Sequence, residues 1–89
     1  MMGTDWLPEG TLRSAVSEDG SRRMALYVRK DGLFSFNEER FETEDLRQFG
    51  SGILRYWTDG SSGGLFDSED AAWSAALSEL PWLRSTGPR

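Results

Sequence analysis

Two runs of alternating apolar and polar residues around an Asp-Gly pair constrain the fold of this chain more than any other feature. Both runs lie in the stretch RRMALYVRKDGLFSFN. Its alternating apolar residues are Met24, Leu26, Val28, Phe34 and Phe36. Successive side chains of a strand point to opposite faces, and Asp-Gly is a frequent hairpin turn. The stretch therefore predicts an antiparallel hairpin.

The length of the turn decides whether these apolar residues share a face. A two-residue loop, Asp31-Gly32, would put the two runs on opposite faces of the sheet. A three-residue loop that starts at Lys30 pairs Val28 with Phe34, and all the apolar residues then lie on one face. It also gives Gly32 a left-handed conformation, which glycine adopts without strain. We therefore expect the three-residue loop and a single apolar face.

Weaker patterns predict strands before and after the hairpin. Residues 12–16 predict an earlier strand in which Leu12 and Val16 share a face. Residues 53–58 contain β-branched and aromatic side chains and also predict a strand. The inward face of this strand has two alternatives, Ile53 with Trp57 or Leu54 with Tyr56. The first pair carries slightly more apolar area and is favoured.

Residues 40–52 predict a connection between the hairpin and the last strand. The sequence Thr-Glu-Asp-Leu within this segment resembles the capped start of a helix. One helical turn is therefore expected to begin at Thr43.

A C-terminal helix is predicted over residues 68–79. Asp67 is the expected N-cap, with Asp70 three positions further on. Pro81 ends the pattern, because proline cannot continue a helix. Apolar residues recur at helical spacing at Trp73, Ala76, Leu77 and Leu80. The helix is therefore expected to pack one face against the sheet.

These elements predict an α+β fold, an antiparallel β-meander of three or four strands with one C-terminal α-helix packed on one face. Trp82 and Leu83 are expected to fold back over the open edge of the core. A small open barrel with the helix at one end is the alternative. A chain of 89 residues has room for one small core. The expected limits are residues 1–89 for a single domain, about 10–83 for its core, and 1–5 and 85–89 for frayed ends.

Aromatic content indicates how such a core is filled. The chain has four Trp, five Phe and two Tyr residues, which suit a core built from a few large side chains. The aromatic residues expected in the core are Phe34, Phe36, Trp57 and Trp73.

Composition excludes several classes of function. The chain has neither cysteine nor histidine, so disulfides, thiolate zinc sites and Cys or His nucleophiles are excluded. Its formal net charge of −5 disfavours duplex nucleic acid as a partner. No apolar run reaches the length of a membrane span. We expect a soluble cytoplasmic protein with no cofactor.

The glycine-rich stretch DGSSGGLFDSEDAAW, residues 59–73, raises the question of phosphate binding. A phosphate loop needs a helix N-terminus free of negative charge and usually a nearby lysine. Here Asp67, Glu69 and Asp70 surround the helix start, and no lysine lies nearby. The stretch is therefore interpreted as a flexible crossover and helix cap. These carboxylates and Asp59 lack the ligand spacing of a calcium loop, so no metal site is predicted.

A dense group of acidic residues is the first candidate for a binding surface. Its members are Glu38, Glu39, Glu42, Glu44 and Asp45. Arg40 and Arg47 are interleaved with them, which is typical of a solvated surface loop. A compact anionic surface speeds the capture of a basic partner. As an alternative, paired carboxylates can work as acid and base, but the pattern singles out no catalytic residue.

The solvent face of the sheet is the second candidate. Tyr27 and Arg29 lie on the face opposite the apolar residues of the hairpin. An aromatic ring and a guanidinium on a sheet can hold single-stranded nucleic acid by stacking and charge. The acidic balance of the chain opposes this use.

The function predicted first is a non-catalytic protein-binding or accessory domain, with an immunity-type inhibitor of a basic protein as its most concrete form. One alternative is a carboxylate-dependent hydrolase or small-ligand binder. The other is a single-stranded nucleic-acid binder that uses the exposed sheet face. The outer strands lack proline and dense lysine, so either a monomer or an edge-paired homodimer is expected.

Overall fold

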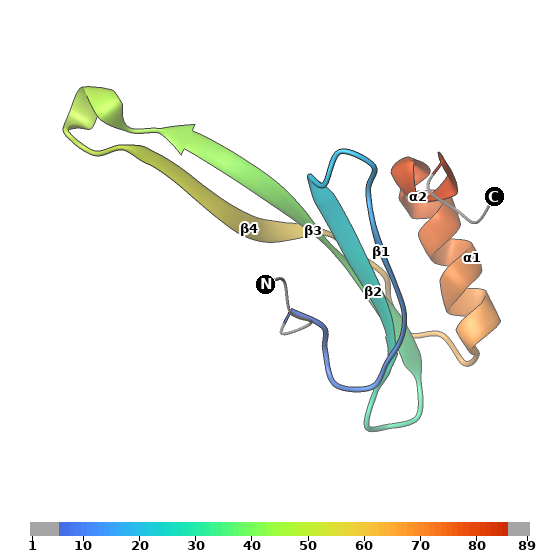
Figure 1. Ribbon diagram of the computed structural model, residues 1–89. Coiled ribbons are helices and arrows are strands. Elements are labelled where there is room, and N and C mark those ends of the chain that lie inside the picture. Colours follow the sequence, from blue (N-terminus) through green and yellow to red (C-terminus); the bar gives the residue numbers. More distant parts are fainter. Residues whose placement is uncertain (1–5, 86–89) are drawn as a thin grey trace.

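A computed structural model describes residues 6–85 of the chain and shows one antiparallel sheet with its helices on one side (Figure 1). The four strands lie in the order β1-β2-β3-β4, each paired with its neighbour in sequence. The elements are β1 (Thr11–Val16), β2 (Arg22–Val28), β3 (Phe34–Asp45), the 3₁₀ turn η1 (Arg47–Phe49), β4 (Ile53–Ser62), α1 (Glu69–Glu79) and α2 (Pro81–Ser85). The predicted α+β meander is confirmed, with four strands, and the sheet is open rather than a barrel.

The β2–β3 hairpin has the predicted three-residue loop. The N–H of Arg29 donates to the carbonyl of Leu33 at 2.7 Å, and Val28 lies opposite Phe34. Gly32 has a φ of 86°, the left-handed conformation that the loop requires. The alternation of apolar residues has therefore selected the register.

The core lies between this hairpin and the helices. Met24, Leu26 and Phe36 are fully buried, and Phe34 packs against them. Val28 is only half-buried and lies outside this cluster, so four of the five side chains expected in this layer contribute to the core. The helices contribute the buried residues Ala72, Ala76, Leu80 and Leu83. Burial of each large apolar side chain contributes roughly 1.5–3 kcal/mol.

The small side chains of α1 allow the helix to lie close to the sheet. Ala72 and Ala76 are fully buried on the side of α1 that packs into the core. The cap differs by one residue from the prediction, because the Oγ of Ser68, rather than Asp67, accepts from the N–H of Ala71. After α1 the chain folds back as predicted, so that Leu83 is buried and Trp82 packs against the core.

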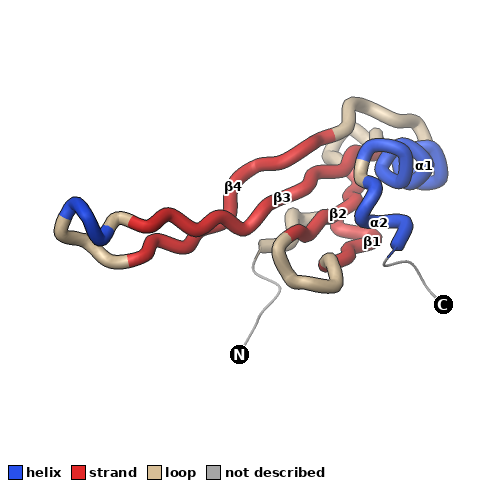
Figure 2. Tube along the Cα trace, turned by 90° about the horizontal axis from the view of Figure 1, so that it is seen from above, coloured by secondary structure: helices blue, strands red, loops and turns tan. Residues whose placement is uncertain are grey.

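The two long strands form a projecting ribbon where the sequence predicted a connection. Residues 40–52 were expected to be a loop with a helical turn from Thr43, but β3 continues to Asp45 and the only turn there is η1. The local helix signal is overridden because β3 pairs with β4 along this whole segment. Arg40 is the last residue of β3 that pairs with β2. We call residues 41–58, beyond it, the arm (Figures 1 and 2).

A second cluster of side chains lies on the face of the sheet away from α1. The guanidinium of Arg23 lies 3.7 Å from the ring centroid of Trp57 and 4.5 Å from that of Trp6. Phe41 contacts Trp57 edge to face, with ring centroids 5.2 Å apart. Trp57 was expected in the main core, and this prediction is wrong because its side chain lies on the face of the sheet away from α1.

Neither predicted inward face of the last strand packs into the main core. Ile53, Leu54 and Tyr56 are exposed, and only Trp57 is half-buried, in the cluster around Arg23. Leu12 and Val16 of β1 are exposed as well. Apolar side chains on the outer strands are therefore displayed rather than buried.

Two remaining expectations concern the chain ends and membranes. Ser85 was expected in a frayed end but is the last residue of α2, while the frayed ends predicted for 1–5 and 86–89 lie outside the described residues. Within the part of the chain that is described, no helix is long and apolar enough to cross a bilayer.

Candidate functional site

The acidic group predicted to form one surface loop lies in β3, whose alternation divides it between the two faces of the sheet. Glu38, Glu42 and Glu44 point to the side of α1, and Glu39 and Asp45 point to the other side. The group is therefore not one continuous anionic patch, and its members have different environments.

Glu38 is buried, which contradicts its assignment to a partner-binding surface. It is only 3% exposed and accepts a hydrogen bond from the indole N–H of Trp82 at 2.7 Å. It also accepts from the backbone N–H of Ser61 at 2.9 Å, and the guanidinium of Arg22 lies 3.4 Å away. These bonds compensate the desolvation of the carboxylate. Glu38 therefore connects α2 to the base of the arm.

Two further carboxylates of the group have arginine partners. Glu39 and Arg23 are 2.7 Å apart, and the Arg23 side chain is only 11% exposed. Asp45 and Arg47 are also 2.7 Å apart, and the Arg47 guanidinium and backbone N–H both donate to Asp45 and lower its pKa. The negative charge of these two residues is thus largely balanced within the chain.

Glu42, which is half-buried, and Glu44, which is exposed, remain as the anionic part of the group without an arginine partner among the described residues. Glu42 lies opposite Tyr56 in the β3–β4 ladder, and Glu44 lies opposite Leu54. The Tyr56 hydroxyl donates to Glu44 at 3.4 Å, and the charge of Glu44, followed by desolvation and the charge of Glu42, raises the pKa of Tyr56. Anionic and apolar groups are thus mixed on the α1-facing side of the arm.

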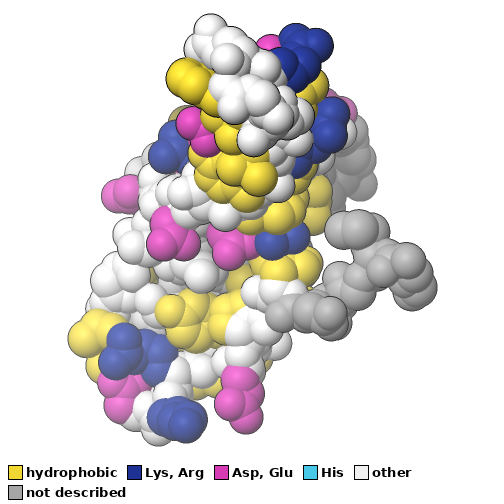
Figure 3. All heavy atoms as spheres, turned by 90° about the vertical axis from the view of Figure 1, so that its left-hand side faces the viewer, with side chains coloured by type: hydrophobic (Ala, Val, Ile, Leu, Met, Phe, Trp, Pro, Cys, Tyr) yellow, Lys and Arg dark blue, Asp and Glu magenta, His cyan; other side chains and the backbone are white. Residues whose placement is uncertain are grey.

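The arm also carries most of the large apolar side chains that the described residues expose. Phe49, in the turn at its tip, is 74% exposed. The others on the arm are Phe41, Ile53, Leu54 and Tyr56. Figure 3 looks onto the arm from the left of Figure 1 and shows hydrophobic side chains there among acidic and basic ones. Exposed apolar groups within a polar surround are typical of protein interaction sites.

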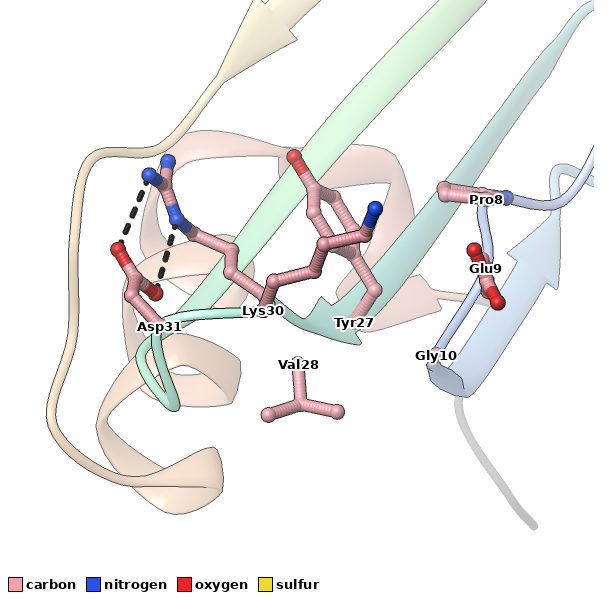
Figure 4. A pocket seen from close by; sticks show the side chains of 8 residues that line it. Pro8, Glu9, Gly10, Tyr27, Val28, Lys30 and Asp31 are labelled. Atoms are coloured by element: carbon pink, nitrogen blue, oxygen red, sulfur yellow. Dashed lines mark hydrogen bonds and ion pairs between the residues drawn. The ribbon is translucent and has the colours of Figure 1, made fainter.

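The second candidate, Tyr27 with Arg29, lines an open hollow of about 680 Å³ at the β2–β3 turn. Arg29 is paired with Asp31 at 3.1 Å, so its charge is balanced. Figure 4 shows the carboxylates of Glu9 and Asp31 on opposite sides of the hollow. The structure therefore places Tyr27 and Arg29 in one hollow with Lys30, and the carboxylates of Glu9 and Asp31 offset the two basic charges there.

A smaller hollow of about 250 Å³ lies where the β1–β2 turn meets Trp82. Asp19 lines it, and hydrogen bonds from the Ser21 backbone N–H and the hydroxyls of Ser17 and Ser21 lower the pKa of Asp19 to about 2. A carboxyl used as a general acid near neutral pH needs a raised pKa instead. Among residues 6–85, no three Asp or Glu side chains are grouped so as to hold a metal ion.

The glycine-rich stretch serves close packing. A side chain at Gly63 would overlap the ring of Phe36, and the Gly63 N–H donates to the Phe36 carbonyl at 2.9 Å. The start of α1 is occupied by its own cap and by Glu69, which pairs with Arg13 at 2.7 Å. These contacts agree with a crossover and cap rather than a phosphate loop.

Sequence reasoning missed two features of the site, the arm itself and the separation of Glu38 from the other carboxylates. The apolar alternation of Phe34 and Phe36 breaks before Phe41, which lies on the opposite face of β3 and pairs with Trp57, so the local pattern gave no signal for the arm.

Comparisons of the chain with protein-family models, with curated proteins and with solved structures found no match.

Proposed function

We propose that this chain is a non-catalytic protein-binding domain whose arm binds a basic partner protein. The observation that carries the proposal is the α1-facing side of the arm, where Glu42 and Glu44 alternate with the exposed side chains of Leu54 and Tyr56. An immunity-type inhibitor is the most concrete form of such a domain. We infer that it works in the cytoplasm, because a chain without cysteine forms no disulfide and so does not need an oxidising compartment to fold.

The shape of the arm supports the proposal. A two-stranded ribbon is marginally stable in water unless another layer covers it. Within residues 6–85, no strand pairs with the outer side of β3 beyond Arg40, and apolar side chains on both faces of the ribbon are exposed. Solubility alone gives no reason for apolar residues at these positions. A partner that covers them would stabilise the arm.

The electrostatics of the arm support a basic partner. The raised pKa of Tyr56 reports a negative potential around Glu42 and Glu44. A partner that places arginine or lysine there, next to apolar side chains, would satisfy both kinds of group. Charge complementarity mainly raises the association rate, and salt screens it.

The test uses a synthetic peptide in which arginine alternates with leucine, with a glutamate–leucine peptide as its control. We expect NMR shifts of backbone amides on adding the basic peptide to be confined to residues 41–58. The double variant Glu42→Gln, Glu44→Gln should weaken binding about tenfold, and added salt should slow association. The control variant Glu9→Gln, Glu79→Gln removes two exposed carboxylates elsewhere and should bind like the wild type. Shifts confined to the body of the domain, or equal binding by both double variants, would refute the proposal.

A further inference from the structure

The outer edge of β4 is unprotected against pairing with another strand. β4 is the last strand in the sheet order, and its ten residues include neither proline nor lysine. From Ile53 to Asp59 its pairing with β3 is regular, and the register shifts only after that. Natural edge strands are usually protected by proline, lysine, a bulge or a cover. The regular part of β4 has none of the first three.

The charges on this edge strand are arranged symmetrically around Trp57. Arg55 and Asp59 lie two residues before and two residues after it, so all three side chains are on the same face. Within residues 6–85, neither Arg55 nor Asp59 has an ion pair. The residues directly opposite them on β3 supply no opposite charge, because Arg55 lies opposite Thr43 and Asp59 lies opposite Glu39. The strand therefore displays two unpaired charges of opposite sign.

We propose that β4 pairs antiparallel with β4 of a second copy of this chain, about a two-fold axis at Trp57. In an antiparallel pair, residues equally far from the axis lie directly opposite each other. Arg55 of each copy then faces Asp59 of the other, so two opposite-charge pairs form at cross-strand distance. The two Trp57 side chains lie next to each other on the same face.

Neighbouring registers are less favourable. An axis at Arg55 places two arginines opposite each other, and like charges at this position are destabilising. An axis at Tyr56 places Asp59 opposite Ile53 and leaves both charges unpaired. The charge pattern therefore selects the register centred on Trp57.

This dimer gives the arm a third strand on one side and joins the two sheets into one. It uses the edge of β4, whereas the proposed partner surface uses the face that carries Glu42 and Glu44. The inference thus goes beyond the proposed function and can fail independently of it.

Charge reversal tests the register. We expect sedimentation of the wild type to show a monomer–dimer equilibrium at concentrations up to about 1 mM. Arg55→Asp and Asp59→Arg should each weaken dimerisation about tenfold, because each places like charges opposite each other twice. The double variant Arg55→Asp, Asp59→Arg should restore it. Mixing the two single variants should also produce a heterodimer. In that pair, the two acidic side chains of one copy face the two basic side chains of the other.

Two controls distinguish the interface from a folding defect. Arg84→Asp reverses an exposed charge on α2 and should dimerise like the wild type. Hydrogen exchange of the wild type should show that amides of residues 53–59 become more protected as concentration rises. A wild-type chain that stays monomeric at every concentration would overturn the proposal. Single reversals that dimerise as strongly as the wild type would overturn the register.

Discussion

At the scale of single residues, Glu38 connects segments that are distant in sequence. Its carboxylate accepts from Trp82 in α2 and from the backbone of Ser61 in β4, and it is nearly fully buried. A side chain at Gly60 would overlap this carboxylate. The glycine therefore leaves room for the acid at the point where β4 bends toward the arm.

Replacing Glu38 by alanine should lower the free energy of unfolding by about 2–4 kcal/mol. The reason is that the indole N–H of Trp82 and the N–H of Ser61 lose their acceptor while both remain part-buried. Urea denaturation measures the loss. Glu79→Ala, at the exposed end of α1, is the control and should change stability by less than about 0.5 kcal/mol. A similar effect of both substitutions would contradict the assignment of Glu38.

Asp19 links stability to acidic pH. Three hydrogen bonds from Ser17 and Ser21 lower its pKa to about 2 in the folded chain, against about 3.9 for an unperturbed aspartate. A carboxyl with a lowered pKa contributes stability that is fully present above its unfolded pKa and is lost as pH falls toward its folded pKa. We therefore expect the stability difference between wild type and Asp19→Asn to be constant above about pH 5 and to shrink between about pH 4 and 2.

Carboxyl NMR titration provides the direct measurement for Asp19. Its resonance should titrate near pH 2, well below the ordinary range for an aspartate. A midpoint for Asp19 in the ordinary range for aspartate would show that the serine hydrogen bonds do not persist in solution.

At the scale of elements, the arm depends on the cluster at its base. Arg23 lies between the rings of Trp6 and Trp57 and also binds Glu39. A guanidinium is planar and stacks on aromatic rings while donating to a carboxylate, which an ammonium group cannot reproduce. The position therefore requires arginine rather than any basic residue.

Arg23→Lys should lower the free energy of unfolding by about 1–2 kcal/mol. It should also speed the hydrogen exchange of amides in the arm more than in β2, because the cluster fixes the arm to the body. Arg40→Lys, at an exposed position of β3, is the matched control and should leave both quantities near wild type. Equal exchange rates in the two variants would show that the arm is held by its ladder alone.

The β2–β3 hairpin could be predicted from the sequence because two local signals agree. The alternation of Leu26 and Val28 with polar residues, and the turn preference of Gly32, select the same register. The arm could not be predicted in this way. Around Thr43 the local sequence favours a helix start, and the competing information lies in cross-strand pairs with residues more than ten positions away. The pairing of β3 with β4 therefore overrides the local helix signal in this segment.

The site was predicted only in part, for a related reason. Glu44 is exposed as expected and Glu42 is half-buried, but Glu38, on the same face of β3, is buried and hydrogen-bonded to Trp82. Acidic residues are rarely buried unless they are paired, so composition gave no reason to separate Glu38 from the group. The separation depends on where α2 folds back, which is a property of the tertiary structure.

At the scale of the whole molecule, the body and the arm are energetically distinct. The fully buried apolar residues belong to β2, to the first part of β3 and to the helices, and none lies between residues 41 and 58. Most of the net charge of −5 also belongs to the rest of the chain, because Glu42, Glu44 and Asp45 with Arg47 and Arg55 give the arm a net charge of only −1. The body should therefore fold without the tip of the arm.

Shortening the arm tests this division. Replacing residues 44–54 by Asn-Gly connects Thr43 directly to Arg55, which already lie opposite each other in the ladder, by a two-residue turn. We expect a cooperatively folded variant whose circular dichroism spectrum retains the helices and whose melting temperature falls by no more than about 5 °C. The variant should also fail to bind the arginine–leucine peptide. An unfolded variant would show that the arm contributes to the stability of the body.

The hydrogen bond between Trp82 and Glu38 has a consequence for biosynthesis. The sheet is complete once Ser62 has been made, yet among the described residues its apolar face is covered by Phe66 and by residues of α1 and α2 that follow, and the buried carboxylate acquires its indole donor from α2. While the ribosome is still adding those helices, the nascent sheet presents Met24, Leu26 and Phe36 to water. Any interruption of translation before residue 82 would thus release a chain in which the apolar face of the sheet is exposed to solvent. We expect such fragments to be captured by chaperones or degraded.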